Sequence, residues 1–197
     1  MRKNRKDVAK FLFCLGILEG RVFQLFGRIS EKVELPTVKF SLLYVAYDSL
    51  KNSVILGELS KSLAMSEVKI RDYEKVLGEV WKTVAGLSKE ILEKEKIGEE
   101  NLLLLTKKLI SIYAVLLVQL KTLRFMSKEI SEAYNVDIET LNSILELVIE
   151  DEETDTQVLT HIKDFFVKKP EEAIDGTPTT KYTNPDKWYR PAVIAGQ

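Results

Sequence analysis

Apolar residues recur at alternating spacings of three and four along most of this chain, the pattern of helices that bury one face in a bundle. Pro36 suits the first turn of a helix, and Asp137 suits a helix N-cap. The pattern predicts four long helices and, between the second and third, one or two shorter ones that are capped near Ser66 and broken around three glycines. The long helices are expected at about residues 6–33, 36–64, 99–134 and 137–168, and the glycines are Gly78, Gly86 and Gly98.

The connections predict how these helices are arranged. The first and second long helices, and the third and fourth, are joined by very short links, so each pair is expected to form an antiparallel hairpin. The stretch of about 65–98 is long enough to cross the length of the bundle. The expected fold is therefore an all-α four-helix bundle over residues 1–169, made of two hairpins joined by a long, partly helical crossover.

The last 28 residues differ from the rest, because four of the five prolines lie after residue 169. Proline prevents long helices, so residues 170–197 are expected to form an extended tail. Tyr182, Trp188, Tyr189, Val193 and Ile194 make this segment too apolar for a purely solvating tail. We expect part of it to dock on the bundle or on a partner.

Composition and charge exclude several classes of protein. The 197 residues are 45% apolar and 30% charged, with a formal net charge of -1, which favours a soluble domain and makes nucleic acid an unlikely main partner. The single Cys14 allows no intramolecular disulfide, and the single His161 excludes sites that need several imidazoles. The apolar run 109–120 is only 12 residues long, so no membrane span is expected, and the interpretation is a cytoplasmic protein.

Polar residues interrupt the apolar seam of each long helix once, near its middle. They are Glu19 on the first helix, Ser49 and Asn52 on the second, Gln119 on the third, and Glu152 and Asp155 on the fourth. Counted from the two hairpin turns, all six lie at similar heights, so they are expected to meet at one level in the core. Buried carboxylates are costly without a partner, so this level needs protons, a cation, water or a metal ion.

One residue, then a pair at i and i+3, then one residue, then another pair is also the layout of metal ligands in ferritin-like di-iron carboxylate proteins. Over about residues 6–168 the chain resembles that superfamily, and in style it is closest to the rubrerythrin-like branch. The resemblance matches Glu19 to the carboxylate of the first helix and Glu152 to the bridging carboxylate of the fourth. The other four positions depart from the family pattern: Ser49 replaces a bridging Glu, Gln119 replaces a carboxylate, and Asn52 and Asp155 replace the two histidines.

These departures imply a changed or vestigial metal centre. The preferred interpretation is a metal-free polar network without a cofactor. The alternatives are one hard divalent cation held by oxygen ligands and, less favoured, a working iron site. Lys51 and Arg124, beside the seams, are candidates to neutralise a carboxylate. We therefore expect a non-catalytic structural or interaction protein that pairs with itself or another protein through bundle faces and the tail. The alternative is a metal-binding protein or oxidoreductase with an altered carboxylate site.

Overall fold

A computed structural model of the chain describes the backbone of residues 2–63 and 70–168 and the side chains of residues 7–63 and 71–168. This part of the chain is all-helical, as predicted, and it contains no strand. The predicted cap near Ser66 and the predicted tail at residues 170–197 lie outside the described residues. The helices are α1 (Arg2–Lys32), α2 (Pro36–Leu63), α3 (Ile70–Leu77), α4 (Glu79–Glu93), α5 (Glu99–Phe125), α6 (Ser127–Tyr134) and α7 (Ile138–Val167).

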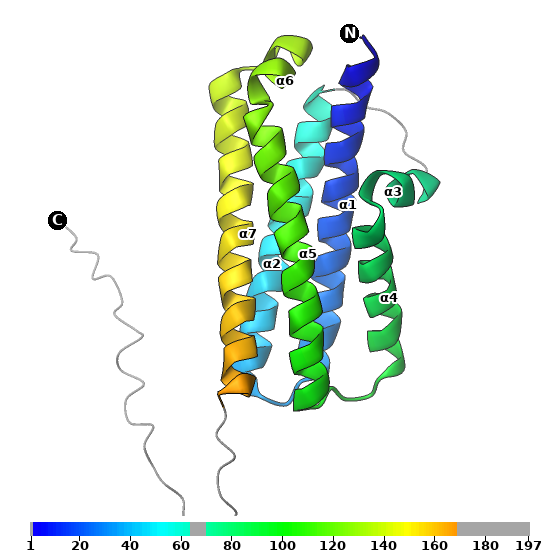
Figure 1. The fold of residues 1–197 in the computed structure, drawn as a ribbon, viewed down its shortest axis with the longest axis vertical. Helices are drawn as coiled ribbons and strands as arrows, with labels where there is room; N and C mark the ends of the chain where they lie inside the picture. The colour runs from blue at the N-terminus through cyan, green and yellow to red at the C-terminus, as the bar shows by residue number, and fades with distance from the viewer. Residues whose placement is uncertain (1, 64–69, 169–197) are drawn as a thin grey trace, which may run out of the picture.

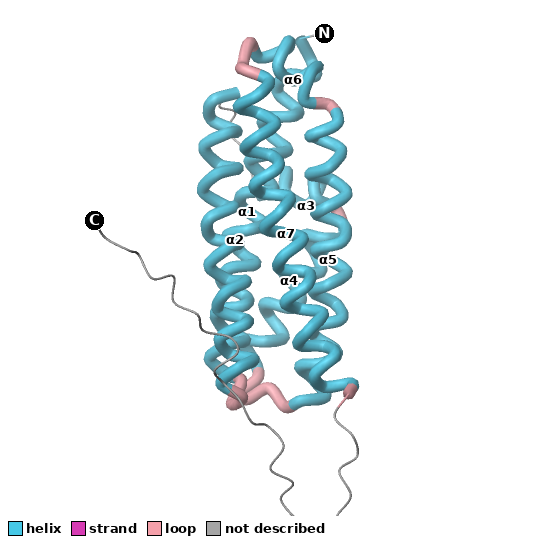
Figure 2. Tube along the Cα trace, turned by 90° about the vertical axis from the view of Figure 1, so that its left-hand side faces the viewer, coloured by secondary structure: helices cyan, strands magenta, loops and turns pink. Residues whose placement is uncertain are grey.

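Four long helices lie side by side and enclose one core (Figure 1). α1 and α2 form one antiparallel hairpin, and α5 with α7 forms another, while α2 also packs against α7. The shorter α3 and α4 run back along the outside of α1, so that α5 begins at the end of the bundle where α1 ends. Viewed from the side, α2 and α5 are on opposite flanks of the molecule (Figure 2).

The observed boundaries agree with most of the predicted ones and correct two of them. The helix predicted over 99–134 is interrupted at Met126 and continues as α6. Gly86 does not interrupt a helix, because it lies inside α4. Gly78 does separate α3 from α4, with a φ of 56°, a left-handed conformation that favours glycine. Asp137 caps α7 as predicted, accepting a hydrogen bond from the Thr140 N–H at 2.7 Å.

The predicted seams are the core of the bundle. Every seam position of α1 and α2 is buried, and so are most of those on α5, α6 and α7. Among the predicted seam positions, which continue the spacing of three and four, Gln119 and Phe166 are only half-buried, whereas Met126 and Ile138 are exposed. Met126 occupies the interruption between α5 and α6, and Ile138 is the first residue of α7, so the predicted spacing is lost where a helix is broken or begins.

Glycine and serine let α1 and α2 approach each other closely. A Cβ atom added at Gly16 would lie 3.0 Å from the Ser53 carbonyl oxygen and 3.1 Å from the Gly57 nitrogen, both backbone atoms. Across the same contact, the Ser53 hydroxyl donates to the Gly16 carbonyl at 2.6 Å, and the Ser60 hydroxyl donates to the Ala9 carbonyl at 2.6 Å. Small residues therefore determine the separation of this hairpin's two helices.

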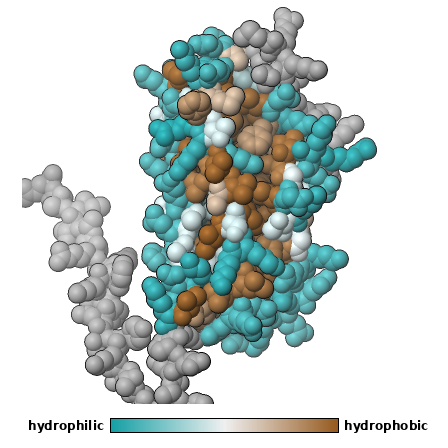
Figure 3. All heavy atoms as spheres, in the orientation of Figure 1, coloured by the Kyte–Doolittle hydropathy of each residue, from teal (hydrophilic) through white to brown (hydrophobic). Residues whose placement is uncertain are grey.

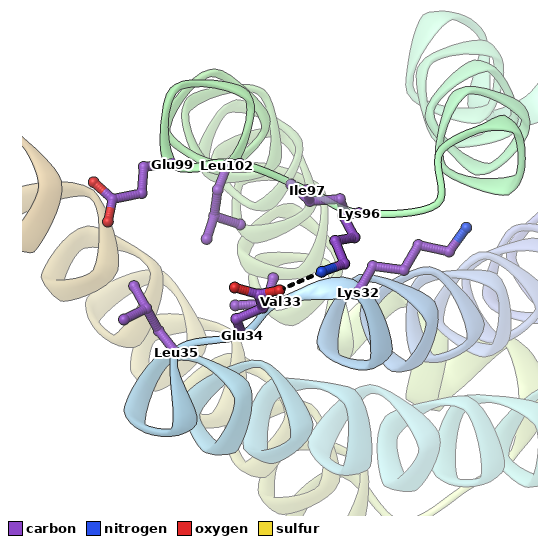
Figure 4. Close-up of a pocket in the computed structure, with 9 residues that line it drawn as sticks. Lys32, Val33, Glu34, Leu35, Lys96, Ile97, Glu99 and Leu102 are labelled. Atoms are coloured by element: carbon purple, nitrogen blue, oxygen red, sulfur yellow. Dashed lines mark hydrogen bonds and ion pairs between the residues drawn. The ribbon is translucent and has the colours of Figure 1, made fainter.

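Lys32 connects the crossover to the end of α1. Its ammonium group donates to the Ile91 carbonyl at 2.7 Å, and also to the carbonyl of Lys94, the residue just after α4. The last carbonyls of a helix have no N–H four residues further on within the helix, so Lys32 supplies donors at this end. The Lys32 carbonyl in turn accepts from the Ile97 N–H at 3.1 Å. A small pocket of about 230 Å³ lies at this end of the bundle, where Lys96 and Glu34 form a 2.6 Å ion pair (Figure 4).

α2 and α5 also carry apolar residues on the faces that point away from the core. The brown surface seen from the side of α5 shows such residues between hydrophilic margins (Figure 3). By length and composition α5 as a whole is able to cross a membrane, unlike the 12-residue run considered above, and only 39% of its most apolar window is buried. Core helices of soluble proteins meet the same criterion, so it does not distinguish the two environments.

Two alanine substitutions within α1 test the close contact with α2. Gly16→Ala should lower the free energy of unfolding by about 1–2 kcal/mol, because the new methyl group meets the backbone of α2. Gly27→Ala is the matched control: it meets nothing within 4 Å, so it should raise stability by about 0.5–1 kcal/mol through helix propensity. Urea denaturation followed by circular dichroism measures both. Stabilisation by Gly16→Ala would contradict the contact.

Candidate functional site

Five of the six polar residues predicted to meet in the core do lie together. α1 contributes Glu19, α2 contributes Ser49 and Asn52, and α7 contributes Glu152 and Asp155, each of which has at most 1% of its surface exposed. Their positions follow from the seams, because each replaces an apolar residue on the buried face of its helix. We call these five residues, with Tyr113, the polar level.

Side-chain hydrogen bonds link the polar level across the core. The Asn52 amide donates to Glu152 Oε1 at 3.1 Å, which joins α2 to α7. The hydroxyl groups of Ser49 and Tyr113 lie 3.1 Å apart, and Tyr113 donates to Asp155 Oδ2 at 3.3 Å. Glu19 lies close enough to Ser49 and Glu152 for both to influence the pKa of its carboxyl group. All four long helices therefore share one network.

α5 joins this network through Tyr113 and not through Gln119. Tyr113 is fully buried, and its ring packs edge-on against Phe26 of α1, with 6.2 Å between the ring centroids. Gln119 is half-buried at the margin of the helix, and its Oε1 atom has no hydrogen-bond partner. The sequence did contain a signal for Tyr113, since it has the largest side chain with a polar group inside the apolar run 109–120.

Burial keeps the carboxyl groups of the polar level protonated at neutral pH. Desolvation raises the pKa of Glu19 to about 8; the negative charge of Asp155 adds to this shift, and hydrogen bonds from Ser49 and Glu152 oppose it. Desolvation and the charge of Glu152 raise the pKa of Asp155 to about 9. The pKa of Glu152 is also raised well above its usual value, by burial first and by Glu19 second.

Protons also account for oxygen atoms that otherwise have no partner. One oxygen each of Glu19, Asn52, Glu152 and Asp155 is buried without a hydrogen bond. All four atoms are hydrogen-bond acceptors, so the polar level lacks hydrogen-bond donors and has more acceptors than it can satisfy. A protonated carboxyl group supplies one O–H donor. Three neutral carboxyl groups can therefore satisfy oxygen atoms that three carboxylates would leave unpaired.

The cations near the polar level do not neutralise it. Lys51 pairs with Asp48 at 3.0 Å and with Asp151 at 2.9 Å, both at the surface between α2 and α7. Arg124 pairs with Glu146 at 2.6 Å. The sequence-based suggestion that Lys51 or Arg124 neutralises a central carboxylate is therefore wrong, because each is held by acidic groups outside the core.

The donor set does not fit a di-iron centre. Such a centre needs bridging carboxylates and usually nitrogen ligands, whereas the polar level has no imidazole, and His161 is exposed on α7. Within the described residues, no group of three or more His, Cys, Asp or Glu side chains is arranged to hold a metal ion. The geometry instead supports a network held by protons.

Comparisons of this chain with protein-family models, with curated proteins and with solved structures give no match.

The raised pKa values predict that the protein loses stability as pH rises. In the unfolded chain these carboxyl groups ionise near pH 4, whereas in the folded chain Glu19 and Asp155 ionise near 8 and 9. Their stabilising contribution is complete below about pH 4 and declines up to about pH 9, by at most about 1.4 kcal/mol per pH unit for each group. The charged or titratable groups around them are Tyr113 on α5, Asp48 and Lys51 on α2, and Asp151 on α7.

Urea denaturation at several pH values between about 5 and 9 measures this decline, and Glu152→Gln is the informative variant. Glutamine keeps the shape of a protonated Glu152 and cannot ionise, so the variant should lose less stability between these pH values than the parent protein does. Asp164→Asn on the exposed part of α7 is the control, and it should leave the slope unchanged over this range. A parent protein whose stability rises from pH 5 to pH 9 would contradict protonation of the core.

Metal analysis tests the same interpretation independently. After incubation with Fe²⁺, Mn²⁺, Mg²⁺ or Ca²⁺ and removal of free ions, we expect elemental mass spectrometry to find no stoichiometric metal. Near-stoichiometric metal that is lost in both Glu19→Gln and Glu152→Gln would instead establish a metal centre at the polar level.

Proposed function

We propose that the protein is a non-catalytic, ferritin-like bundle that has lost the di-iron site and acts as a structural or interaction protein, pairing with a second copy of itself. Burial of the polar level supports the non-catalytic part, because a substrate cannot reach Glu19, Glu152 or Asp155 unless the helices separate. The outer face of α2 supports the pairing.

The exposed apolar residues of α2 form a symmetric stripe centred on Tyr47. Tyr44 and Leu50 lie three residues to either side of Tyr47, and Phe40 and Val54 lie seven residues to either side. Spacings of three and four keep all five on one side of a helix. Tyr47 is 65% exposed and Phe40 is 71% exposed, so the described chain leaves most of each side chain uncovered. This stripe is the single observation on which the proposal depends.

A twofold dimer brings the same surface of two copies together, so that residue i of one copy meets residue j of the other and the reverse. If two α2 helices cross antiparallel at Tyr47, Phe40 meets the other copy's Val54, Tyr44 meets its Leu50, and the two Tyr47 rings meet at the axis. The stripe is therefore complementary to itself. Aromatic residues are also enriched at the centres of protein interfaces.

The surroundings of Tyr47 suit this arrangement. Phe23 of α1 packs against the Tyr47 ring with 6.2 Å between centroids, which supports the ring from below. Lys51, the charged residue within the stripe, is already paired with Asp48 and Asp151. Its charge is thus balanced inside one copy and does not repel the Lys51 of the other.

Cysteine cross-linking tests the geometry directly. Cys14 is buried, and burial raises the pKa of its thiol to about 11, so an introduced surface cysteine is the reactive one. Under mild oxidation Tyr47→Cys should give a disulfide-linked dimer. A mixture of Tyr44→Cys and Leu50→Cys proteins should cross-link to each other more than either does to itself. Denaturing gels without reductant show both results.

Light scattering after size-exclusion chromatography tests the assembly without cross-links. The parent protein should be a dimer, and Tyr47→Glu should be a monomer with an unchanged helical spectrum. Val118→Glu, on the exposed outer face of α5, is the matched control and should remain a dimer. A monomeric parent protein at high concentration, or a dimer that survives Tyr47→Glu and is lost in Val118→Glu, would refute pairing through α2.

A further inference from the structure

A second surface feature is a groove between α1 and α4, with Ser53 of α2 at its side. Its volume is about 580 Å³, which is within the range of pockets that bind small organic molecules. Gly20 lies in the groove, so α1 presents no side chain at that one position. The lining residues are Ile17, Gly20, Arg21, Gln24, Arg28, Ser53, Ala85, Ser88, Lys89 and Leu92.

The charge of this groove departs from that of the whole chain. Arg21, Arg28 and Lys89 line it and no carboxylate from residues 7–63 or 71–168 does, although the protein has a formal net charge of -1. None of the three forms one of the ion pairs found in the described part of the chain, whereas many other lysines there are paired with Asp or Glu. Three unneutralised cations around one hollow favour an anionic ligand.

The individual side chains indicate what kind of anion fits. The Arg21 guanidinium lies 4.2 Å from the centre of the Trp81 ring, so stacking orients it while its N–H donors stay available. Guanidinium groups bind phosphate and carboxylate with two parallel hydrogen bonds, and a lysine adds a mobile positive charge.

The neutral side chains in the groove suit the organic part of such a ligand. The hydroxyl groups of Ser53 and Ser88 already donate to backbone carbonyls, so their oxygen atoms are free to accept hydrogen bonds from a ligand. Ile17, Ala85 and Leu92 provide apolar contact. A ligand that combines a phosphate group with a hydroxyl-bearing organic part would use all three kinds of side chain.

We propose that the groove between α1 and α4 binds a phosphate monoester, with Arg21, Arg28 and Lys89 holding the phosphate. Two sources supply this chemistry: a soluble sugar or glycerol phosphate, and phosphatidic acid, a membrane phospholipid whose phosphate is a monoester. The proposal is independent of pairing through α2, because none of the residues in the symmetric stripe of α2 lines the groove. A failure of one leaves the other standing.

Titration calorimetry with glycerol 3-phosphate at low salt tests the site. The informative variant is Arg28→Gln combined with Lys89→Gln, because neither side chain packs on Trp81, whereas replacing Arg21 would disturb that stacking. Lys39→Gln combined with Lys128→Gln is the matched control, since it removes the same charge from exposed positions outside the groove. We expect the groove variant to bind at least about tenfold more weakly, and the control to match the parent protein. Binding should also weaken as salt is added.

Two further probes distinguish the sources of the phosphate. Sedimentation with phosphatidylcholine vesicles, with and without phosphatidic acid, shows whether the groove takes a lipid headgroup. Vesicle binding that needs phosphatidic acid and is lost in the groove variant supports the membrane source. Binding of glycerol 3-phosphate without vesicle binding supports the soluble source. The proposal is overturned if the parent protein binds neither probe at low salt, or if the groove variant and the control bind equally well.

Discussion

Protonation of the buried carboxyl groups is the condition on which the centre of this bundle depends. Glu19, Glu152 and Asp155 occupy positions on seams that are otherwise almost entirely apolar, and no cation in the described part of the chain is paired with any of them. If all three were charged, their mutual repulsion and their desolvation would oppose the packing of all four long helices. As neutral acids they instead donate and accept hydrogen bonds, so the same residues hold the four helices at one height.

The sequence predicted the fold well because helical periodicity is a local property. The seams of α1 and α2 were identified in full, and the heights of Glu19, Ser49, Asn52, Glu152 and Asp155 were obtained by counting from the two turns. The third seam was less accurate. Gln119 and Tyr113 both lie near the buried side of α5. Spacing alone does not show that the side chain of Tyr113, six residues before Gln119, is the one whose hydroxyl group reaches the polar level.

Other features depend on contacts between elements that periodicity does not contain. The approach of Gly16 to the backbone at Ser53 requires knowledge of how α1 and α2 face each other. The partners of Lys51 are on α2 and α7, so its position beside a seam gave no indication that surface acids would hold it. The groove likewise joins residues of three helices, because Arg28, Ser53 and Lys89 are far apart in the chain. The absence of imidazole from the polar level could be predicted, since it follows from residue types alone.

The junction at Lys32 has a consequence for the order in which the chain folds during synthesis. The α1–α2 hairpin uses contacts between neighbours in sequence, so it can form as soon as both helices have left the ribosome. The end of the crossover, by contrast, is anchored when the carbonyls of Ile91 and Lys94 reach the ammonium group of Lys32, about 60 residues after Lys32 itself was made. α5 begins just beyond that junction. In a nascent chain the first hairpin therefore exposes the face that will pack against α7 until the second hairpin has also been made.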